Sequence, residues 1–163
     1  MARKKHHSAL NKILFLFFLF GIFICANRYL SDLILSNLRK GINLPQNNII
    51  TFDYVQNNGA AFNILNGNTT LLILLALIAL IFFFAYIIKN AETMSYMGIF
   101  WLSLIMSGIF CNCIERVSFG YVRDYFNLIF IKFPVFNISD IAINIGVLAV
   151  IILLFKRVRL SQL

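Results

Sequence analysis

Two aspartates, Asp124 and Asp140, lie near the two ends of a segment built almost entirely from aromatic and β-branched residues, FGYVRDYFNLIFIKFPVFNISD at 119–140. The chain has only 6 acidic residues among 163. Two carboxyl groups held close together cannot both ionise easily, so one keeps a proton while the other acts as a base toward water. Such a pair can add water to a peptide carbonyl. These residue types therefore indicate hydrolysis by an aspartic dyad.

Other catalytic chemistries are not indicated. The only histidines, His6 and His7, lie in the basic N-terminal segment, so a Ser–His pair is not expected, and no zinc or phosphate-loop motif is present. Cys111 and Cys113 form a weak metal signal without His or acidic neighbours at ligand spacing, and buried inert thiols explain them better. We therefore expect no metal and no cofactor, with water as the only co-reactant.

Each aspartate also has a structural explanation. Asp140 begins a helix whose first-turn amides favour a negative charge, so it could be a helix N-terminal acid paired with Arg116 or Arg123. Asp124 could be a solvated acid on an outer loop. A carboxylate inside a membrane costs about 2.5 to 3.5 kcal/mol on insertion scales, which makes each intramembrane acid a functional candidate.

The elements that must position these residues are membrane helices. The chain is 61% hydrophobic with a mean hydropathy of +0.86, and residues 71–88 carry no charge. About 20 apolar residues cross a hydrocarbon core. Three further segments are long enough to cross, although polar residues interrupt each of them. We predict an all-α membrane protein forming a single integral membrane domain over 1–163, with four transmembrane helices at about 13–35, 69–88, 97–114 and 138–156.

Two longer connections, 36–68 and 115–137, join these helices on one side. Residues 48–55, NIITFDYV, have the composition of a strand and precede a turn at 57–59, so we expect a small β-rich segment there. Residues 127–136, NLIFIKFPVF, are too short to span a membrane, and we predict an interfacial loop between the third and fourth helices.

The basic residues predict the orientation. Eight of the 14 Lys and Arg residues lie in the N-terminal segment, the 89–96 loop and the C-terminal tail. Lys and Arg in short loops stay cytoplasmic, so both termini are expected in the cytoplasm and the two longer connections on the outer face. The N-terminal apolar segment is interpreted as an uncleaved anchor, because no small-x-small cleavage site follows. The net charge of +8 indicates orientation and contact with anionic lipids, not a nucleic-acid partner.

Four motifs in this order resemble the lipoprotein signal peptidase (signal peptidase II) family. They are NNGAAFNIL at 57–65, CNCIER at 111–116, GYVRDYF at 120–126 and FNISD at 136–140. The corresponding family patterns are N-x-G-A-A-F, G-N-x-x-D-R, V-x-D-F and F-N-x-A-D. The resemblance covers the whole four-helix plan.

The resemblance implies a bacterial aspartic endopeptidase of the cytoplasmic membrane, multi-pass and active near the outer face. It would cut the signal peptide from prolipoproteins just before a diacylglyceryl-modified cysteine. The family's catalytic dyad falls on Asp124 and Asp140. The supporting or substrate-binding positions fall on Asn57, Gly59, Asn112, Arg116 and Asn137. The expected partners are these prolipoproteins and membrane lipids, with the enzyme acting as a monomer.

The physical roles of the supporting residues can also be stated as hypotheses. The three asparagines would orient the dyad or the substrate backbone by hydrogen bonds, and Arg116 would fix the outer connection. Gly59 and its following alanines would allow another backbone to approach closely. Phe62 and the aromatic residues would pack on lipid or on the substrate's acyl chains.

The chain also departs from the family pattern. Glu115 and Cys111 replace Asp and Gly of the second motif, Ser139 replaces the Ala next to Asp140, and Gln56 stands where many members carry Arg. In the first helix, residues 27–31, NRYLS, replace Asp-Gln-x-x-Lys, which makes a supporting role for that helix doubtful.

Two other functions remain open from the sequence. One is an inactive relative that binds lipoproteins or lipid, which would be marked by loss of an aspartate. The other is a small proton-coupled transporter subunit. A proton path should place acids near the bilayer centre on several helices, whereas the acids here gather at one edge. An active peptidase is therefore favoured.

Overall fold

The computed structural model describes residues 2–42, 44, 47–60 and 64–160. All four of its helices are long and apolar enough to cross a membrane. This confirms the predicted class of four transmembrane helices with a small β segment. The helices are α1 (Ala2–Arg39), α2 (Thr69–Asn90), α3 (Tyr96–Phe119) and α4 (Ile138–Leu160).

All four helices extend past the predicted spans, α2 to Asn90 and α4 to Leu160. α1 extends beyond 13–35 at both ends, and α3 continues past 114 to Phe119. Gly120 ends α3 in the left-handed region at φ 84°, with its N–H donating to the Arg116 carbonyl at 2.9 Å. Glu115 and Arg116 therefore lie on a helix, not in the outer connection 115–137 to which we assigned them.

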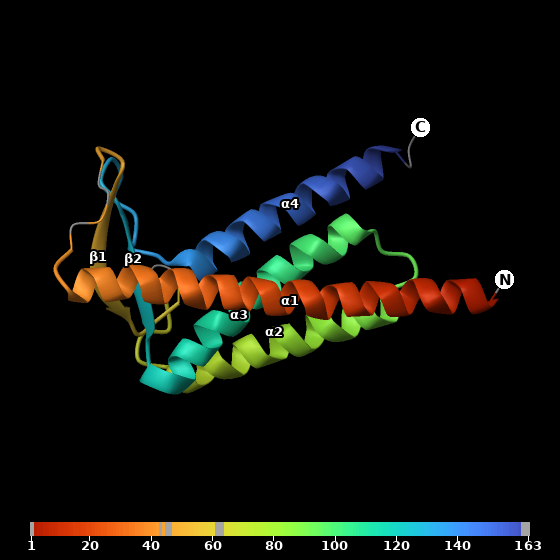
Figure 1. Cartoon of the computed structure of the whole chain (residues 1–163), viewed down its shortest axis with the longest axis horizontal. Coiled ribbons are helices and arrows are strands. Elements are labelled where there is room, and N and C mark those ends of the chain that lie inside the picture. Colours follow the sequence, from red (N-terminus) through yellow and green to blue (C-terminus); the bar gives the residue numbers. More distant parts are fainter. Residues whose placement is uncertain (1, 43, 45–46, 61–63, 161–163) are drawn as a thin grey trace.

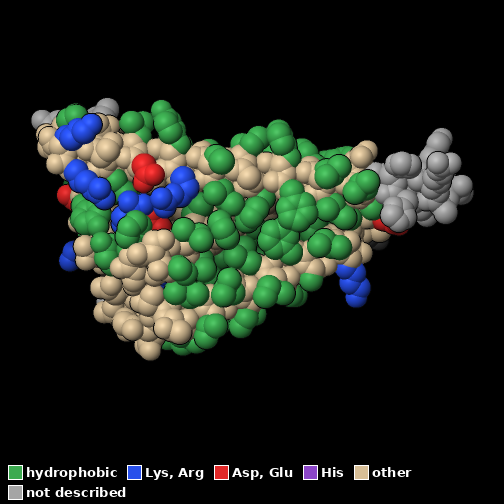
Figure 2. Space-filling model, turned by 60° about the horizontal axis from the view of Figure 1, so that its bottom comes forward, with side chains coloured by type: hydrophobic (Ala, Val, Ile, Leu, Met, Phe, Trp, Pro, Cys, Tyr) green, Lys and Arg blue, Asp and Glu red, His purple; other side chains and the backbone are tan. Residues whose placement is uncertain are grey.

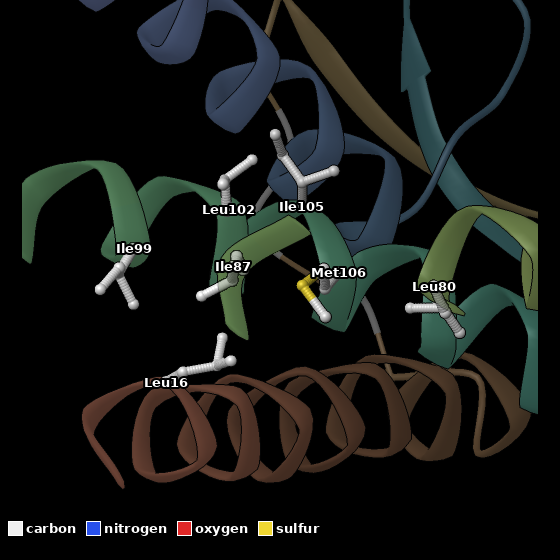
Figure 3. Close-up of a cluster of buried hydrophobic side chains, with 7 residues drawn as sticks. All are labelled: Leu16, Leu80, Ile87, Ile99, Leu102, Ile105 and Met106. Carbon is white, nitrogen blue, oxygen red and sulfur yellow. The ribbon is translucent and has the colours of Figure 1, made fainter. Parts of the chain in front are cut away.

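α3 is the central helix and packs against the other three. A buried apolar cluster joins it to α1 and α2 (Figure 3). Its members are Leu16, Leu80, Ile87, Ile99, Leu102, Ile105 and Met106. The outer surfaces of the helices are also apolar, as the side chains over the middle of the molecule in Figure 2 show. The charged side chains of that face gather mostly toward the end that carries the sheet.

Two glycines let α3 and α4 approach closely. A Cβ on Gly108 would lie 2.6 Å from the Ser139 carbonyl oxygen, and one on Gly146 would lie 2.5 Å from Ile105 Cγ1. Small residues permit such close helix contacts in membranes. The packing at Gly108 holds the first turn of α4, which contains Asp140, against α3.

The sheet lies at the end of the molecule opposite the chain termini (Figure 1). β1 (Ile50–Asn57) pairs antiparallel with β2 (Val122–Leu128), with Val55 opposite Asp124 and Asn57 opposite Val122. β1 was expected, but β2 was not, so Asp124 lies on a strand and not on a solvated loop. The charged residues Arg123 and Asp124 obscure the strand pattern in the sequence, because both are buried by neighbouring elements.

The connection from β2 to α4 keeps the two elements together. Phe136 forms an antiparallel bridge with Phe126, and the Tyr125 N–H donates to the Phe136 carbonyl at 3.0 Å. Within the expected interfacial loop, 127–136, residues 127 and 128 belong to β2 and Phe136 forms the bridge. Ile129, Phe130 and Ile131 beyond β2 are exposed. The bridge brings the start of α4 back beside Asp124.

Candidate active site

Asp140 lies in the first turn of α4, where Asn137 is the residue that caps the helix. The Asn137 N–H donates to Asp140 Oδ2 and the Asp140 N–H donates to Asn137 Oδ1, each at 3.1 Å. This reciprocal arrangement is a capping box. The other carboxylate oxygen, Asp140 Oδ1, accepts a hydrogen bond of 2.8 Å from Asn112 of α3. The Asp140 carboxylate is thereby held by two elements.

Two asparagine side chains hold the Asp124 carboxylate by hydrogen bonds. Its Oδ2 accepts a hydrogen bond of 2.9 Å from Asn57 at the end of β1, and its Oδ1 accepts one of 2.7 Å from the Asn137 side chain. The Asn137 amide also donates to Asn112 Oδ1 at 3.2 Å. The three asparagines thus connect the two aspartates through one hydrogen-bond network.

The environment of Asp124 favours its protonated form. The residue is only 1% exposed. Burial, followed by the nearby Asp140 charge, raises the pKa of Asp124 to about 7, against the opposing hydrogen bonds from Asn57 and Asn137. A carboxyl group with such a pKa can hold or release a proton near neutral pH, which general acid–base catalysis requires.

Both aspartates line one cavity of about 630 Å³ at the sheet end of the helices. Its polar wall also includes Asn57, Asn112 and Arg116. Most of its other lining is apolar and comes from the two strands, the segment before α4 and α4 itself. These apolar residues are Val55, Ala60, Val122, Leu128, Phe133, Pro134, Val135, Phe136, Ile141 and Ile145. The cavity therefore combines a carboxylate pair with walls suited to an apolar substrate.

Arg116 connects α3 to the turn that follows β1. Its guanidinium donates to the Gly59 carbonyl at 2.7 Å and to the Asn112 carbonyl at 3.2 Å. The Gly59 N–H donates to Asn57 Oδ1 at 2.9 Å, which closes an Asx turn. The turn holds Asn57 beside Asp124. Ala61 and Phe62 of the same motif lie outside the described residues.

The chain is similar to known bacterial membrane peptidases. The family model for signal peptidase (SPase) II matches residues 13–156. The chain belongs to the signal peptidase II family. It is 36% identical over 136 residues to the lipoprotein signal peptidase of Lactobacillus johnsonii, covering 80% of this chain and 85% of that protein. It is 38% identical over 109 residues to that of Streptococcus pneumoniae, covering 67% and 71%.

A solved structure agrees with the family assignment. A bacterial membrane enzyme determined by the in meso method at 1.9 Å resolution superposes with a TM-score of 0.71 at 30% sequence identity. The match covers 90% of this chain and 93% of that one. Membership of the signal peptidase II family makes this chain a multi-pass bacterial membrane protein and a peptidase. The transporter and the inactive relative are not favoured.

Arg123 does not form the ion pair with Asp140 that the sequence suggested. It points to the other face of β2, where its guanidinium donates several hydrogen bonds to the Glu115 carboxylate, one of them short. The same guanidinium lies 3.5 Å from the Asp32 carboxylate. The hydrogen bond with Glu115 raises the pKa of Arg123. Arg116 donates to two backbone carbonyls and not to Asp140, and one of these carbonyls, that of Gly59, lies in the outer connection 36–68 that we expected Arg116 to fix. The longer Glu115 side chain reaches β2 from α3.

α1 contacts the site region, although its sequence had made a supporting role for this helix doubtful. Arg28 lies 3.4 Å from Glu115, and Asn27 and Ser31 contact the start of α4 and β2. Asn27 and Ser31 are four residues apart, so they lie on one helix face. That spacing of polar residues in an apolar span was the signal that could have identified them. Nothing in the local sequence showed which elements they meet.

Among the described side chains, the three cysteines make none of the contacts given above. Cys111 and Cys113 are buried free thiols on α3, and Cys25 is an exposed free thiol on α1. Cys113 follows Asn112 directly and is buried.

Proposed function

We propose that Asp124 and Asp140 are the catalytic pair of an aspartic endopeptidase. The observation that carries this proposal is that both carboxylates line the same cavity and that asparagine donors hold all four of their oxygens. Catalytic groups must be fixed in advance for a hydrolytic water to be placed between them. In this proposal Asn57, Asn112 and Asn137 orient the pair. Gly59 and Arg116 hold the turn that carries Asn57.

The two carboxyl groups take different roles in this mechanism. The N-terminal amides of α4 favour a negative charge on Asp140, so this residue acts as the base. The raised pKa of Asp124 makes it the acid that carries the proton. The assignment describes a coupled pair, whose proton is shared between the two sites.

The reaction proceeds by addition of water to the scissile carbonyl. Asp140 takes a proton from water as the water oxygen bonds to the carbonyl carbon, and Asp124 gives its proton to the carbonyl oxygen. The tetrahedral intermediate then breaks its C–N bond as Asp140 gives the proton taken from water to the leaving amine and a hydroxyl of the intermediate returns a proton to Asp124. The products are a new carboxyl group and a new N-terminus. Water is the only co-reactant in this scheme.

The substrates we propose are prolipoproteins that carry a diacylglyceryl cysteine, cut just before that cysteine. The relatives named lipoprotein signal peptidase support this choice. The apolar lining of the cavity supports it as well, because acyl chains and an apolar signal helix would bury surface against Phe133, Phe136 and Ile145. The exposed apolar residues 129–131 would contact membrane lipid beside the cavity.

We also infer the topology and assembly. Both chain termini would lie in the cytoplasm, with the sheet and the cavity near the outer face, as the basic N-terminal and C-terminal segments favour. Residues 1–163 would form one membrane domain that acts as a monomer, since one chain supplies both aspartates and the groups that hold them. A labelling experiment on engineered outer-face cysteines tests the orientation.

A defined cleavage assay tests the proposed function. Purified protein in detergent is mixed with a prolipoprotein that either carries or lacks the diacylglyceryl group, and the product's new N-terminus is determined. We expect cleavage of the modified substrate before its cysteine and much slower cleavage of the unmodified one. Equal cleavage of both would contradict the lipid requirement. No cleavage of either by wild-type protein would contradict the peptidase proposal.

A further inference from the structure

We propose that Asn27 and Ser31 of α1 are positioning residues that set the separation of the two catalytic carboxyl groups. They would do so by holding the residue adjacent to each aspartate. This inference rests on the proposed catalytic pair, and it assigns a role to a helix that contributes no carboxylate to it.

Asn27 holds the residue before Asp140. Its side-chain Nδ2 donates to Ser139 Oγ at 2.9 Å. Ser139 lies in the first turn of α4, and its own carbonyl packs against Gly108 of α3. A change at Asn27 therefore acts on the turn that presents Asp140.

Ser31 holds the residue after Asp124. Its hydroxyl forms a hydrogen bond of 2.8 Å with the Tyr125 hydroxyl. Tyr125 is 1% exposed, and it follows Asp124 on β2. The two α1 residues thus reach one aspartate-bearing strand and one aspartate-bearing helix from a single helix face.

These contacts close into one circuit. The Ile138 N–H donates to the Tyr125 hydroxyl at 3.3 Å, and the Ser31 hydroxyl donates to Asn27 Oδ1 at 3.5 Å. Because Ser31 has one proton and gives it to Asn27, the Tyr125 hydroxyl is the donor to Ser31. The donors then run from α4 to β2 to α1 and back to Ser139 of α4. The circuit fixes α4 relative to β2 at the residues beside the aspartates.

The circuit is buried and separate from the substrate cavity. Asn27, Ser31, Tyr125 and Ser139 are each at most 7% exposed, and none of them is among the residues that line the cavity. Buried hydrogen-bond networks that are fully satisfied rigidify their surroundings. These side chains therefore act through their neighbours. Asn27, Ser31 and Ser139 are also positions at which this chain departs from the family pattern given above.

The test removes single members of the circuit. The variants are Asn27→Ala, Ser31→Ala, Ser139→Ala and Tyr125→Phe, of which the last three each delete only one hydroxyl group and are expected to fold. Misplacement of catalytic groups by about 1 Å can cost on the order of 100-fold in rate, so we expect kcat to fall roughly 10- to 100-fold with KM nearly unchanged.

A Ser and an Asn on membrane helices, both outside the circuit, serve as matched controls. The Ser36 hydroxyl donates to the Leu33 carbonyl on α1, and the Asn90 amide donates to the Tyr86 carbonyl on α2. Ser36→Ala and Asn90→Ala should retain the wild-type kcat. The double variant Asn27→Ala/Ser139→Ala should be no slower than the slower single variant, because both changes break the same contact.

The pH profile of kcat separates positioning from simple stabilisation. If the carboxyl groups move apart, their repulsion weakens and the pKa of Asp124 falls, so the alkaline limb of the kcat profile should move to lower pH. Wild-type kcat and an unchanged pH profile in all four variants, whatever their unfolding temperature, would overturn the inference. If wild-type protein cleaves and the Asp124→Asn and Asp140→Asn variants do not, the proposed function is supported whatever the circuit variants do. A wild-type protein that does not cleave overturns both.

Discussion

The Asn137 side chain donates a hydrogen bond of 2.7 Å from Nδ2 to the Asp124 carboxylate, while its Oδ1 accepts one of 3.1 Å from the Asp140 N–H and so caps α4. One residue thus joins the strand that carries one aspartate to the helix that carries the other. The geometry of the proposed catalytic pair depends on this link as well as on the aspartates themselves.

Replacing Asn137 by Ser tests the link while preserving the cap. Ser is as good a helix cap as Asn, but its hydroxyl is too short to reach Asp124. We expect kcat to fall on the order of 100-fold with a small change in unfolding temperature. Cleavage kinetics and thermal unfolding in the same detergent measure the two quantities. A variant with the wild-type kcat would show that Asn137 serves α4 alone.

The pH dependence of stability should carry the signature of Asp124. Burial raises its folded pKa to about 7, whereas an unfolded Asp titrates near 3.9. Between these values the folded state holds a proton that the unfolded state has released, so stability is greatest at low pH and falls as pH rises to about 7. Unfolding measured from pH 4 to 8 should show this slope in wild type and a flatter one in Asp124→Asn. The same slope in both proteins would assign it to other groups.

The Glu115–Arg123 ion pair should matter for stability. Both residues are buried, Glu115 at 7% and Arg123 at 6% exposed. Glu115→Gln leaves the buried Arg123 charge with only the more exposed Asp32 carboxylate at 3.5 Å, and losses from broken buried pairs are roughly 3 to 5 kcal/mol. Denaturant unfolding measures the loss of free energy. Glu92→Gln, at an exposed acid beside the α2–α3 turn, is the control and should be nearly neutral. Equal stability of the two variants would show that Glu115 contributes no net pairing energy.

The close packing of α3 against α4 gives a steric test. Gly108→Ala puts a Cβ 2.6 Å from the Ser139 carbonyl oxygen, so the first turn of α4 must move. We expect lower stability and lower kcat together. Gly21→Ala on α1 is the control, since nothing lies within 4 Å of its added Cβ and Ala favours helix. A Gly108→Ala protein with wild-type kcat and stability would mean that α4 can shift without disturbing Asp140.

The sequence was informative where one local pattern decided the structure. Long apolar runs predicted the four helices, and the acids at both ends of an apolar segment indicated the pair of Asp124 and Asp140. The roles of Arg123 and Glu115 could not be predicted in this way. Their ion pair depends on α3 continuing past residue 114 and on β2 forming beside it, both of which are set by contacts between distant segments.

The capping of α4 shows why two explanations of Asp140 could not be separated from the sequence. The residue does serve as a helix N-terminal acid, and it also lines the cavity with Asp124. Sequence spacing identifies the capping box but not the cavity, because the cavity forms only when β1, β2 and the segment before α4 come together. Local and tertiary roles coincide at this position.

The most direct test of the account is the turnover of a diacylglyceryl-modified prolipoprotein by three matched Asp→Asn variants. Asp124→Asn and Asp140→Asn change the proposed pair, and Asp53→Asn changes an exposed acid on β1. We predict that both cavity variants remain folded and lose cleavage, while Asp53→Asn keeps the wild-type kcat. Undiminished cleavage by either Asp124→Asn or Asp140→Asn would contradict the assignment of these two residues as the catalytic pair.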